Sequence, residues 1–277
     1  MRWLCEALDV SRSGFHAWLT RPPSAWPPSA RTRSDEALGA QVKASFIGSD
    51  RTYGARRVWH DVLADGVTCG LHRVERLMRA LALRARPRRR GRPLDRGIRS
   101  EAADNVLARQ FEAAAPNQKW IADFTYVWTA EGWLYVAAVI DLFSRRVVGW
   151  SMGATMGAQL VADALMMALW RRGKPDALLH HSDQGGQYSS EQFQTLLADH
   201  GVRCSMSRSG NVWDNAAMES VFSSLKTERT ARKVYRTRDQ ARADVFDYIE
   251  RFYNPRRRHS TIGYLSPMEF ERNAASA

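Results

Sequence analysis

The spacing of apolar residues changes near residue 112. Before that point, apolar residues recur every three or four positions, which is typical of helices. Residues 1–20 are predicted to form two short helices, followed by a proline-rich linker. Residues 35–83 are predicted to form three helices separated by turns at Gly54 and Gly66. The N-terminal part of the chain is therefore expected to be helical.

Beyond residue 112, short apolar runs typical of strands alternate with helical patterns. We predict strands at 120–128, 133–141, 146–150, 177–180 and 203–206, and helices at 159–172, at 191–200, from about Asp214 and at 239–252. Three strands followed by alternating helices and strands predict an α/β fold, a mixed sheet with helices on its faces.

Arginines follow the outer face of the third predicted N-terminal helix and continue beyond it. Val74, Leu77, Met78 and Leu81 share one face of this helix, and the arginines lie opposite. Six of residues 84–92 are arginine. The arginines that we expect to bind DNA here are Arg73, Arg76, Arg79, Arg88, Arg89 and Arg90. On the helix alone, an ordinary solvated face would show the same pattern.

Charge is distributed unevenly along the chain. The 277 residues include 41 Lys and Arg against 29 Asp and Glu, a formal charge of +12. Residues 1–100 carry 20 basic and 9 acidic residues, residues 101–220 carry 9 and 13, and residues 221–277 carry 12 and 7. An acidic middle between basic flanks favours a polyanionic partner and a site that uses carboxylates.

Cysteine spacing and hydropathy argue against several other classes of protein. The three cysteines are far apart and form no CxxC pair, so neither a zinc module nor a disulfide framework is expected. The longest apolar run, 133–140, is too short to span a membrane. We expect a cytoplasmic, nucleoid-associated protein without a membrane segment.

Three acids occupy positions that can meet in such a sheet. Asp123 lies within the first predicted strand, Asp183 follows the fourth, and Glu219 lies near the start of a later helix. Carboxylates about 4 Å apart repel one another by roughly 1–4 kcal/mol per pair, so a cluster of three implies bound cations. Two Mg²⁺ ions, with Mn²⁺ as a substitute, would suit phosphodiester cleavage or transfer.

His180 and His181 have no third nitrogen or sulfur ligand nearby, and we expect His180 to pack at the strand end.

Several motif blocks carry a family resemblance. They are WIADFT (120–125), VIDLFSRR (139–146), HSDQGGQY (181–188), SRSGNVWDNAAMES (207–220), FSSLK (222–226), YNPRRRHS (253–260) and YLSP (264–267). In these blocks and their order, with 35 residues between Asp183 and Glu219, the chain resembles the second-frame (orfB) transposases of the insertion-sequence-three family. These transposases are relatives of retroviral integrases.

The resemblance implies an RNase H-like catalytic core that cleaves and transfers DNA strands at insertion-sequence ends. It implies that Asp123, Asp183 and Glu219 are the DDE catalytic acids and bind the two ions. It also places Lys226, seven residues after Glu219 on the same helical face, against the transposon end. Asp141 is a fourth acid in the blocks, and we expect it to be structural and to hold Arg145 or Arg146.

The basic C-terminal part and the family's partners complete the expectations. Arg256 and Arg257 form a cationic patch suited to DNA backbone contacts. Implied partners are double-stranded DNA at the terminal repeats and target, further copies of the chain, and an upstream-frame product with a helix-turn-helix and leucine zipper, as fusion or partner.

We predict four segments: a helical segment with linker (1–34), a helix-turn-helix-like region with its arginine-rich arm (35–95), the catalytic core (112–228) and a basic C-terminal extension (229–277). Two other functions stay open at this point. One is a regulatory DNA-binding protein that retains the acids but rarely catalyses. The other is a nonspecific metal nuclease.

Overall fold

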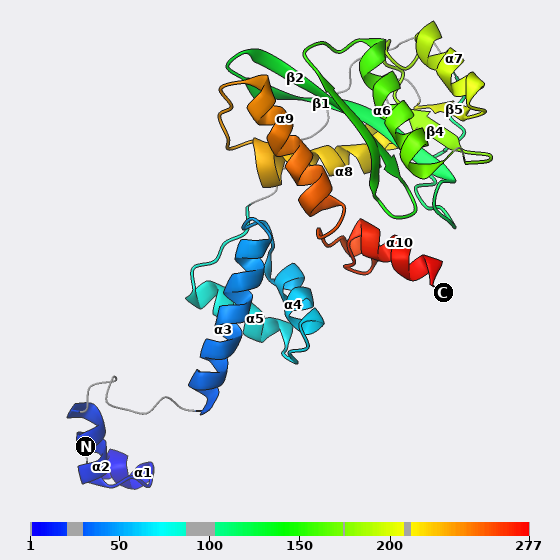
Figure 1. The fold of residues 1–277 in the computed structure, drawn as a ribbon. Coiled ribbons are helices and arrows are strands. Elements are labelled where there is room, and N and C mark those ends of the chain that lie inside the picture. The colour runs from blue at the N-terminus through cyan, green and yellow to red at the C-terminus, as the bar shows by residue number, and fades with distance from the viewer. Residues whose placement is uncertain (1, 21–29, 87–102, 174, 208–211, 277) are drawn as a thin grey trace.

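The computed structural model describes residues 2–20, 30–86, 103–173, 175–207 and 212–276. Figure 1 shows helices in the N-terminal part and, after them, a sheet covered by helices. Both parts of the predicted α/β architecture are confirmed.

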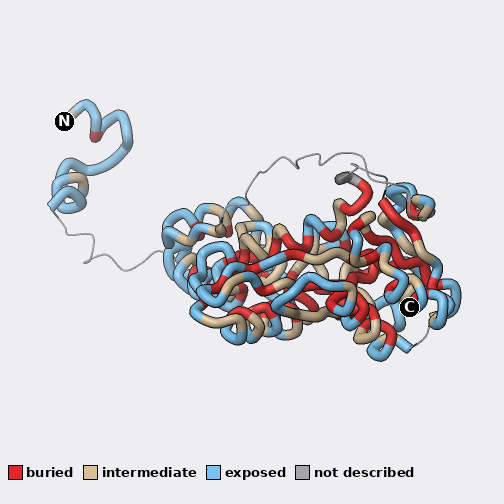
Figure 2. Tube along the Cα trace, turned by 90° about the horizontal axis from the view of Figure 1, so that it is seen from above, coloured by how far each residue is buried: buried red, intermediate tan, exposed pale blue. Residues whose placement is uncertain are grey.

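Five helices form the N-terminal part: α1 (Arg2–Ala7), α2 (Arg12–Thr20), α3 (Ala30–Gly48), α4 (Ala55–Ala64) and α5 (Leu71–Ala80). Most of α1 and α2 is exposed (Figure 2). Helices α3, α4 and α5 pack together through side chains such as Val42, Val58 and Val74, which are fully buried. The turn after α4 needs a glycine, because Gly66 has a φ of 83°.

The sheet has five strands, in the order β3-β2-β1-β4-β5. The strands are β1 (Lys119–Thr129), β2 (Gly132–Asp141), β3 (Val147–Gly153), β4 (Leu179–Ser182) and β5 (Arg203–Met206). β2 pairs antiparallel with β1 and β3, whereas β4 pairs parallel with β1 and β5. The fourth strand begins two residues later than predicted. The ends of this strand were misplaced because His180, His181 and Ser182 are buried although they are polar, and buried polar residues give no apolar pattern in the sequence.

Helices α6 (Ala158–Arg172) and α7 (Glu191–Asp199) lie on one face of the sheet, over Trp120, Ala122 and Val139. The approach of α6 to β3 is close enough to require a glycine. A Cβ atom at Gly149 would lie 2.2 Å from the carbonyl oxygen of Ala164. Gly149 therefore allows α6 to pack closely against β3.

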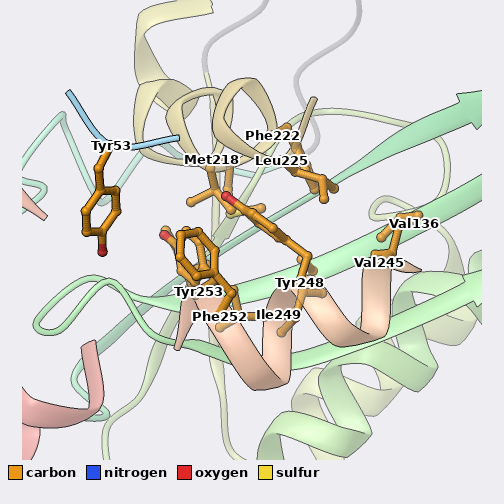
Figure 3. Close-up of a cluster of buried hydrophobic side chains, with 14 of the residues drawn as sticks. Tyr53, Val136, Met218, Phe222, Leu225, Val245, Tyr248, Ile249, Phe252 and Tyr253 are labelled. Atoms are coloured by element: carbon orange, nitrogen blue, oxygen red, sulfur yellow. The ribbon is translucent and has the colours of Figure 1, made fainter. Parts of the chain in front are cut away.

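The other face is covered by α8 (Ala216–Leu225) and α9 (Arg238–Asp247). Two short π-helices continue them, η3 (Lys226–Thr230) and η4 (Tyr248–Tyr253). The predicted helix 239–252 is therefore α9 plus η4. Figure 3 shows side chains of α8, α9 and η4 meeting against the sheet. The basic C-terminal part thus contributes to the main core.

A short 3₁₀-helix, η5 (Ser260–Ile262), and helix α10 (Pro267–Ala275) complete the chain. The sequence interpretation missed α10, although its signal is present. Ser266 and Glu269 form a capping box, with Pro267 at the first helical position.

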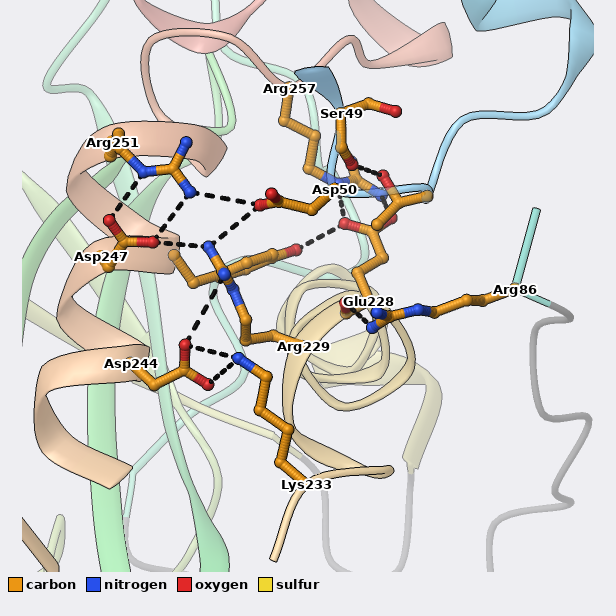
Figure 4. Close-up of polar contacts among 12 residues, drawn as sticks. Ser49, Asp50, Arg86, Glu228, Arg229, Lys233, Asp244, Asp247, Arg251 and Arg257 are labelled. Atoms are coloured by element: carbon orange, nitrogen blue, oxygen red, sulfur yellow. Dashed lines mark hydrogen bonds and ion pairs between the residues drawn. The ribbon is translucent and has the colours of Figure 1, made fainter. Parts of the chain in front are cut away.

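Polar contacts join α3 and α4 to the C-terminal elements (Figure 4). Arg229 pairs with Asp50, Asp244 and Asp247. The Tyr53 hydroxyl donates to the Arg256 carbonyl at 3.0 Å and accepts from the Arg258 backbone N–H at 2.9 Å. The N-terminal helices are therefore held against the C-terminal segment by specific bonds.

No helix among the described residues combines the length and apolar character needed to cross a membrane.

Candidate active site

Strands β1 and β4 bring the first two acids to the same level of the sheet. The parallel ladder pairs Ile121 with His181. Continuing this register by two residues places Asp183, just past the end of β4, beside Asp123. Because side chains alternate along a strand, Asp123 shares its face with Ile121, on the side of the sheet that α8 covers.

Helix α8 carries the third acid over this face. Met218, Phe222 and Leu225 are buried against the sheet, whereas Glu219 is exposed. Helix α8 therefore packs against the sheet through its apolar face, and Glu219 lies outside that contact.

The three carboxylates act on one another electrostatically. Burial, together with the negative charges of Asp183 and Glu219, raises the pKa of Asp123 to about 8, against the opposing effects of the Phe124 backbone N–H and Lys226. Burial also raises the pKa of Glu219. The sequence-predicted acids are thus neighbours.

The three acids, as they lie in the structure, do not form a complete metal-coordination site. Among the residues that the structure describes, no three His, Cys, Asp or Glu side chains are gathered tightly enough to hold a metal. The donor chemistry nevertheless suits a hard cation, since carboxylate oxygens are the ligands that Mg²⁺ prefers. The like-charge effect on Asp123 is what a cation at this position would relieve.

The turn after β4 wraps around Asp183. The Gly185 backbone N–H donates to Oδ1 of Asp183 at 3.0 Å. A Cβ atom at Gly185 would lie 2.9 Å from that same oxygen, so a side chain there would crowd the acid. This turn positions Asp183 through the backbone.

Tyr188 is a site residue that the sequence interpretation passed over. It is buried, and its hydroxyl has no hydrogen-bond partner within the described part of the chain. Burial raises its pKa well above the ordinary value, and so do the charges of Asp123 and Asp183. Its place at the end of the HSDQGGQY block was the available signal.

The two histidines of β4 are structural. Burial lowers the pKa of His180 to about 3, and its ring packs 5.4 Å from that of Phe193, as expected for a strand-end packing residue. His181 Nδ1 lies 2.8 Å from Oγ of Ser205, and its Nε2 lies 3.2 Å from Oγ of Ser207. His181 therefore joins β4 to β5 and its following residue.

Asp214 anchors the start of the helix that bears Glu219. It lies in η2 (Val212–Asn215), immediately before α8, and is fully buried. Its carboxylate accepts from Asn105 Nδ2 at 2.7 Å and from Arg109 Nε at 2.9 Å. The sequence interpretation treated Asp214 only as a helix start.

Asp141 is structural as expected, but its partners differ from the prediction. Its carboxylate accepts from the backbone N–H groups of Asn117 and Phe143, and Arg172 lies 3.4 Å away. Arg145 and Arg146 bond to Asp141 through backbone groups. The charge of Asp141 also opposes the lowering of the Arg145 pKa by burial.

Lys226 lies between the acids and an aromatic ring. Its Nζ is 5.0 Å from the centroid of Tyr126. Burial lowers the pKa of Lys226, and the charge of Asp123 opposes this shift. A cation therefore stands beside the acid site, and its contact with DNA stays a prediction.

The other predicted DNA contacts lie in different environments. Arg73 and Arg76 both pair with Asp35, whereas Arg79 is exposed. Arg88, Arg89 and Arg90 lie outside the described residues.

Arg256 is exposed, but Arg257 is only 5% exposed, and Nη2 and Nε each lie 2.7 Å from an oxygen of Glu228. Because the Arg257 side chain is buried and paired with Glu228, we do not retain it as a DNA contact.

Three family models match the chain. Models described as an integrase core domain match residues 113–212 and 219–274, and one described as an HTH-like domain matches residues 33–91. These matches define the class as an integrase-core protein with a preceding helix-turn-helix-like domain.

Curated relatives narrow the class to a family. Transposase InsF for insertion sequence IS3A of Escherichia coli (strain K12) is 44% identical over 269 residues, 97% of this chain and 92% of that protein. The insertion element IS600 31 kDa protein of Shigella sonnei is 39% identical over 96% of this chain and 97% of its own length. The chain therefore belongs to the IS3 family of transposases, and the predicted resemblance is confirmed.

Solved integrase cores also match. The catalytic core domain of BIV integrase covers 58% of this chain and 97% of its own, at 18% identity and a TM-score of 0.43. The HTLV-2 integrase catalytic core domain, in its trimeric form with magnesium, covers 57% and 98%, at 16% identity and a TM-score of 0.43.

Proposed function

We propose that Asp123, Asp183 and Glu219 are the DDE catalytic acids of this transposase, which cleaves DNA at insertion-sequence ends and transfers the freed strands. The observation that carries the proposal is the placement of Asp123. Asp123 is a buried carboxylate whose charged neighbours include two further acids. The Phe124 backbone N–H and Lys226 offset these effects only in part. A purely structural acid in that position would be fully stabilised by cationic or N–H partners.

The acids would hold divalent cations, two Mg²⁺ or Mn²⁺ in their place. A bound cation neutralises charge on a phosphodiester and lowers the pKa of a nucleophilic water or hydroxyl. The exposed position of Glu219 leaves its side chain room to turn toward the other two acids. The buried hydroxyl of Tyr188 adds a polar group beside the same carboxylates.

The chain's own residues orient these groups. Gly185 holds Asp183 through its backbone N–H, while the Asn105 and Arg109 contacts to Asp214 fix the first turn of α8. Lys226 offers a cation to the DNA backbone next to the acids. Both chemical steps then use one geometry, with water as the nucleophile in cleavage and a 3′-hydroxyl in transfer.

DNA would be bound along the basic parts of the chain. Arg79 and Arg256 are exposed and suited to phosphate contacts. The arginine-rich sequence at residues 84–92 adds further positive charge. Arg73 and Arg76 can contact phosphates only in competition with Asp35. Assembly of several copies at paired ends, and a fused or separate upstream-frame product, belong to the same proposal.

Strand cleavage tests the assignment. Labelled terminal-repeat DNA is incubated with the protein, the upstream-frame product and Mg²⁺. We expect Asp183→Asn to lower the cleavage rate by roughly 10³-fold or more, as loss of a catalytic group does. Asp199→Asn, which changes an exposed acid on α7, is the matched control and should cleave like the wild type.

Unchanged cleavage by Asp183→Asn would reject the site. If the wild type binds the ends without cutting them under any of these conditions, the regulatory DNA-binding function is favoured. Equal cutting of random DNA would favour a nonspecific nuclease.

A further inference from the structure

Three large aromatic side chains lie exposed at the outer end of the hairpin formed by β1 and β2. Tyr126 is 49% exposed, Trp128 58% and Trp133 41%. Figure 1 shows this hairpin extending away from α6 and α7. We call these three residues the aromatic platform.

The strand register places the three rings on one face. Trp128 pairs directly with Trp133, and Tyr126 lies one step away on the same face. The Tyr126 and Trp133 ring centroids are 4.8 Å apart, and those of Trp128 and Trp133 are 4.7 Å apart. The rings therefore form one continuous surface.

The opposite face of the hairpin explains why the platform is uncovered. Val127 and Leu134 are buried in the cluster to which α9 contributes. The cluster beneath α6 reaches the hairpin only as far as Phe124 and Tyr135, which are partly buried. Packing thus uses one face of the hairpin tip and leaves the aromatic face outside.

Two cations border the platform. Lys226 Nζ lies 5.0 Å from the Tyr126 ring centroid. Arg238 Nε donates to the Trp133 carbonyl at 3.0 Å, and its Nη2 lies 3.0 Å from where a Cβ of Gly132 would stand. Aromatic rings beside cations favour a ligand that offers both flat apolar faces and negative charge, as a nucleic acid strand does.

The platform and the acid site lie on opposite faces of β1 and meet at the edge of that strand. The ladder between β1 and β4 ends at Ile121, so β1 runs on beyond the end of that neighbour. Tyr126 follows Asp123 by three residues, about 10 Å along the strand, and this odd spacing turns the two side chains to opposite faces. A side chain at the edge of β1 is therefore needed to reach both. Lys226 contacts the Tyr126 ring and also interacts electrostatically with Asp123.

We propose that the aromatic platform stacks unpaired bases of the DNA strand next to the phosphodiester held at the acids, an inference that rests on the function proposed above. Bases in a duplex already stack on one another and offer no free face to these rings. The platform therefore selects nucleotides that are separated from their partners, and it does so without sequence preference because every base has an aromatic face. Lys226 and Arg238 take the phosphates on either side.

Binding of a single strand tests this inference without any cleavage. The probe is a short fluorescein-labelled oligothymidylate, measured by fluorescence anisotropy with the full chain in EDTA. A second probe of equal length carries abasic sites throughout, so that it keeps the phosphates and lacks the bases. The variant is Trp128→Leu with Trp133→Leu, and Trp170→Leu, at an 81% exposed tryptophan of α6, is the matched control.

We expect the double variant to bind oligothymidylate roughly 5- to 150-fold more weakly for each stack lost. It should bind the abasic probe as the wild type does, and Trp170→Leu should match the wild type on both probes. Restoring rings with Trp128→Phe and Trp133→Phe should recover part of the affinity. Thermal unfolding midpoints, which exposed substitutions should leave unchanged, verify the fold.

Equal loss on both probes, or no loss on either, would overturn the inference. Unchanged DNA binding together with a drop in oligomeric state on sedimentation would also overturn it, by assigning the platform to contact between copies of the chain. The assay does not depend on catalysis by the three acids, because it measures binding in EDTA, where no strand is cleaved. Failure of the platform and failure of the catalytic proposal are therefore separable.

Discussion

Two acids on the same side of the sheet, Asp123 and Glu228, are surrounded in opposite ways. Burial alone would raise the pKa of Glu228, yet the charge and hydrogen bonds of Arg257, with the Tyr248 hydroxyl and Arg57, hold it below its ordinary value. For Asp123 burial and the neighbouring acids together raise the pKa to about 8.

The difference separates a structural acid from a functional one. Glu228 has its partners supplied by the chain: Arg257 at 2.7 Å, the Tyr248 hydroxyl at 2.7 Å and Arg57 at 3.4 Å. It joins η3 to α4 through Arg57. It also joins η3 to the C-terminal segment through Arg257, whose side chain lies beside it in Figure 4. For Asp123 the chain supplies only the Phe124 backbone N–H and the charge of Lys226, which do not offset burial and the neighbouring acids. A cation from outside the chain would supply the rest, which agrees with a role in binding cations.

Removing the charge of Glu228 should have the largest effect on stability. Glu228→Gln leaves the buried Arg257 without its counter-charge, and we expect a loss of about 3–5 kcal/mol in the free energy of unfolding. Urea unfolding measures it. Glu250→Gln is the control, because its ion pair with Arg171 is more exposed and should be worth less than about 1 kcal/mol. Similar losses in both variants would contradict the structural role of Glu228.

Removing the charge of Asp123 should raise the free energy of unfolding, by an amount that depends on pH. In the metal-free protein, folded Asp123 keeps its proton up to about pH 8, while the unfolded chain releases it near 3.8. This acid therefore stabilises the fold most at low pH, and its contribution falls by at most about 1.4 kcal/mol per pH unit as pH rises through that window.

Asp123→Asn should remove this dependence. Its free energy of unfolding, measured in urea with EDTA, should gain on that of the wild type as pH rises from 3.8 toward 8. Stability curves that stay parallel over the window would show that Asp123 titrates normally.

Much of the fold was predictable because local patterns decide it. Alternation located four of the five strands closely, and turn glycines separated α3, α4 and α5. The acids were predictable as a set because strand order places the end of β4 beside β1. The extent of β4 was missed, since buried histidines do not give an apolar pattern.

Other features depend on partners far apart in the sequence. Nothing local to Arg257 shows that Glu228, 29 residues earlier, neutralises it. The same holds for Asp214, whose partners precede it by 105 and 109 residues. The π-helical turns of η3 and η4 escape a periodicity argument, because one extra residue per turn barely changes a short apolar pattern.

Calorimetric titration with Mn²⁺ at about pH 8 tests most directly whether the acids exist to bind cations. The wild type and Asp199→Asn should bind two ions, while Asp123→Asn and Asp183→Asn should lose most of that heat. If both site variants bound Mn²⁺ with the wild-type affinity and stoichiometry, the three acids would not form the metal-dependent catalytic site.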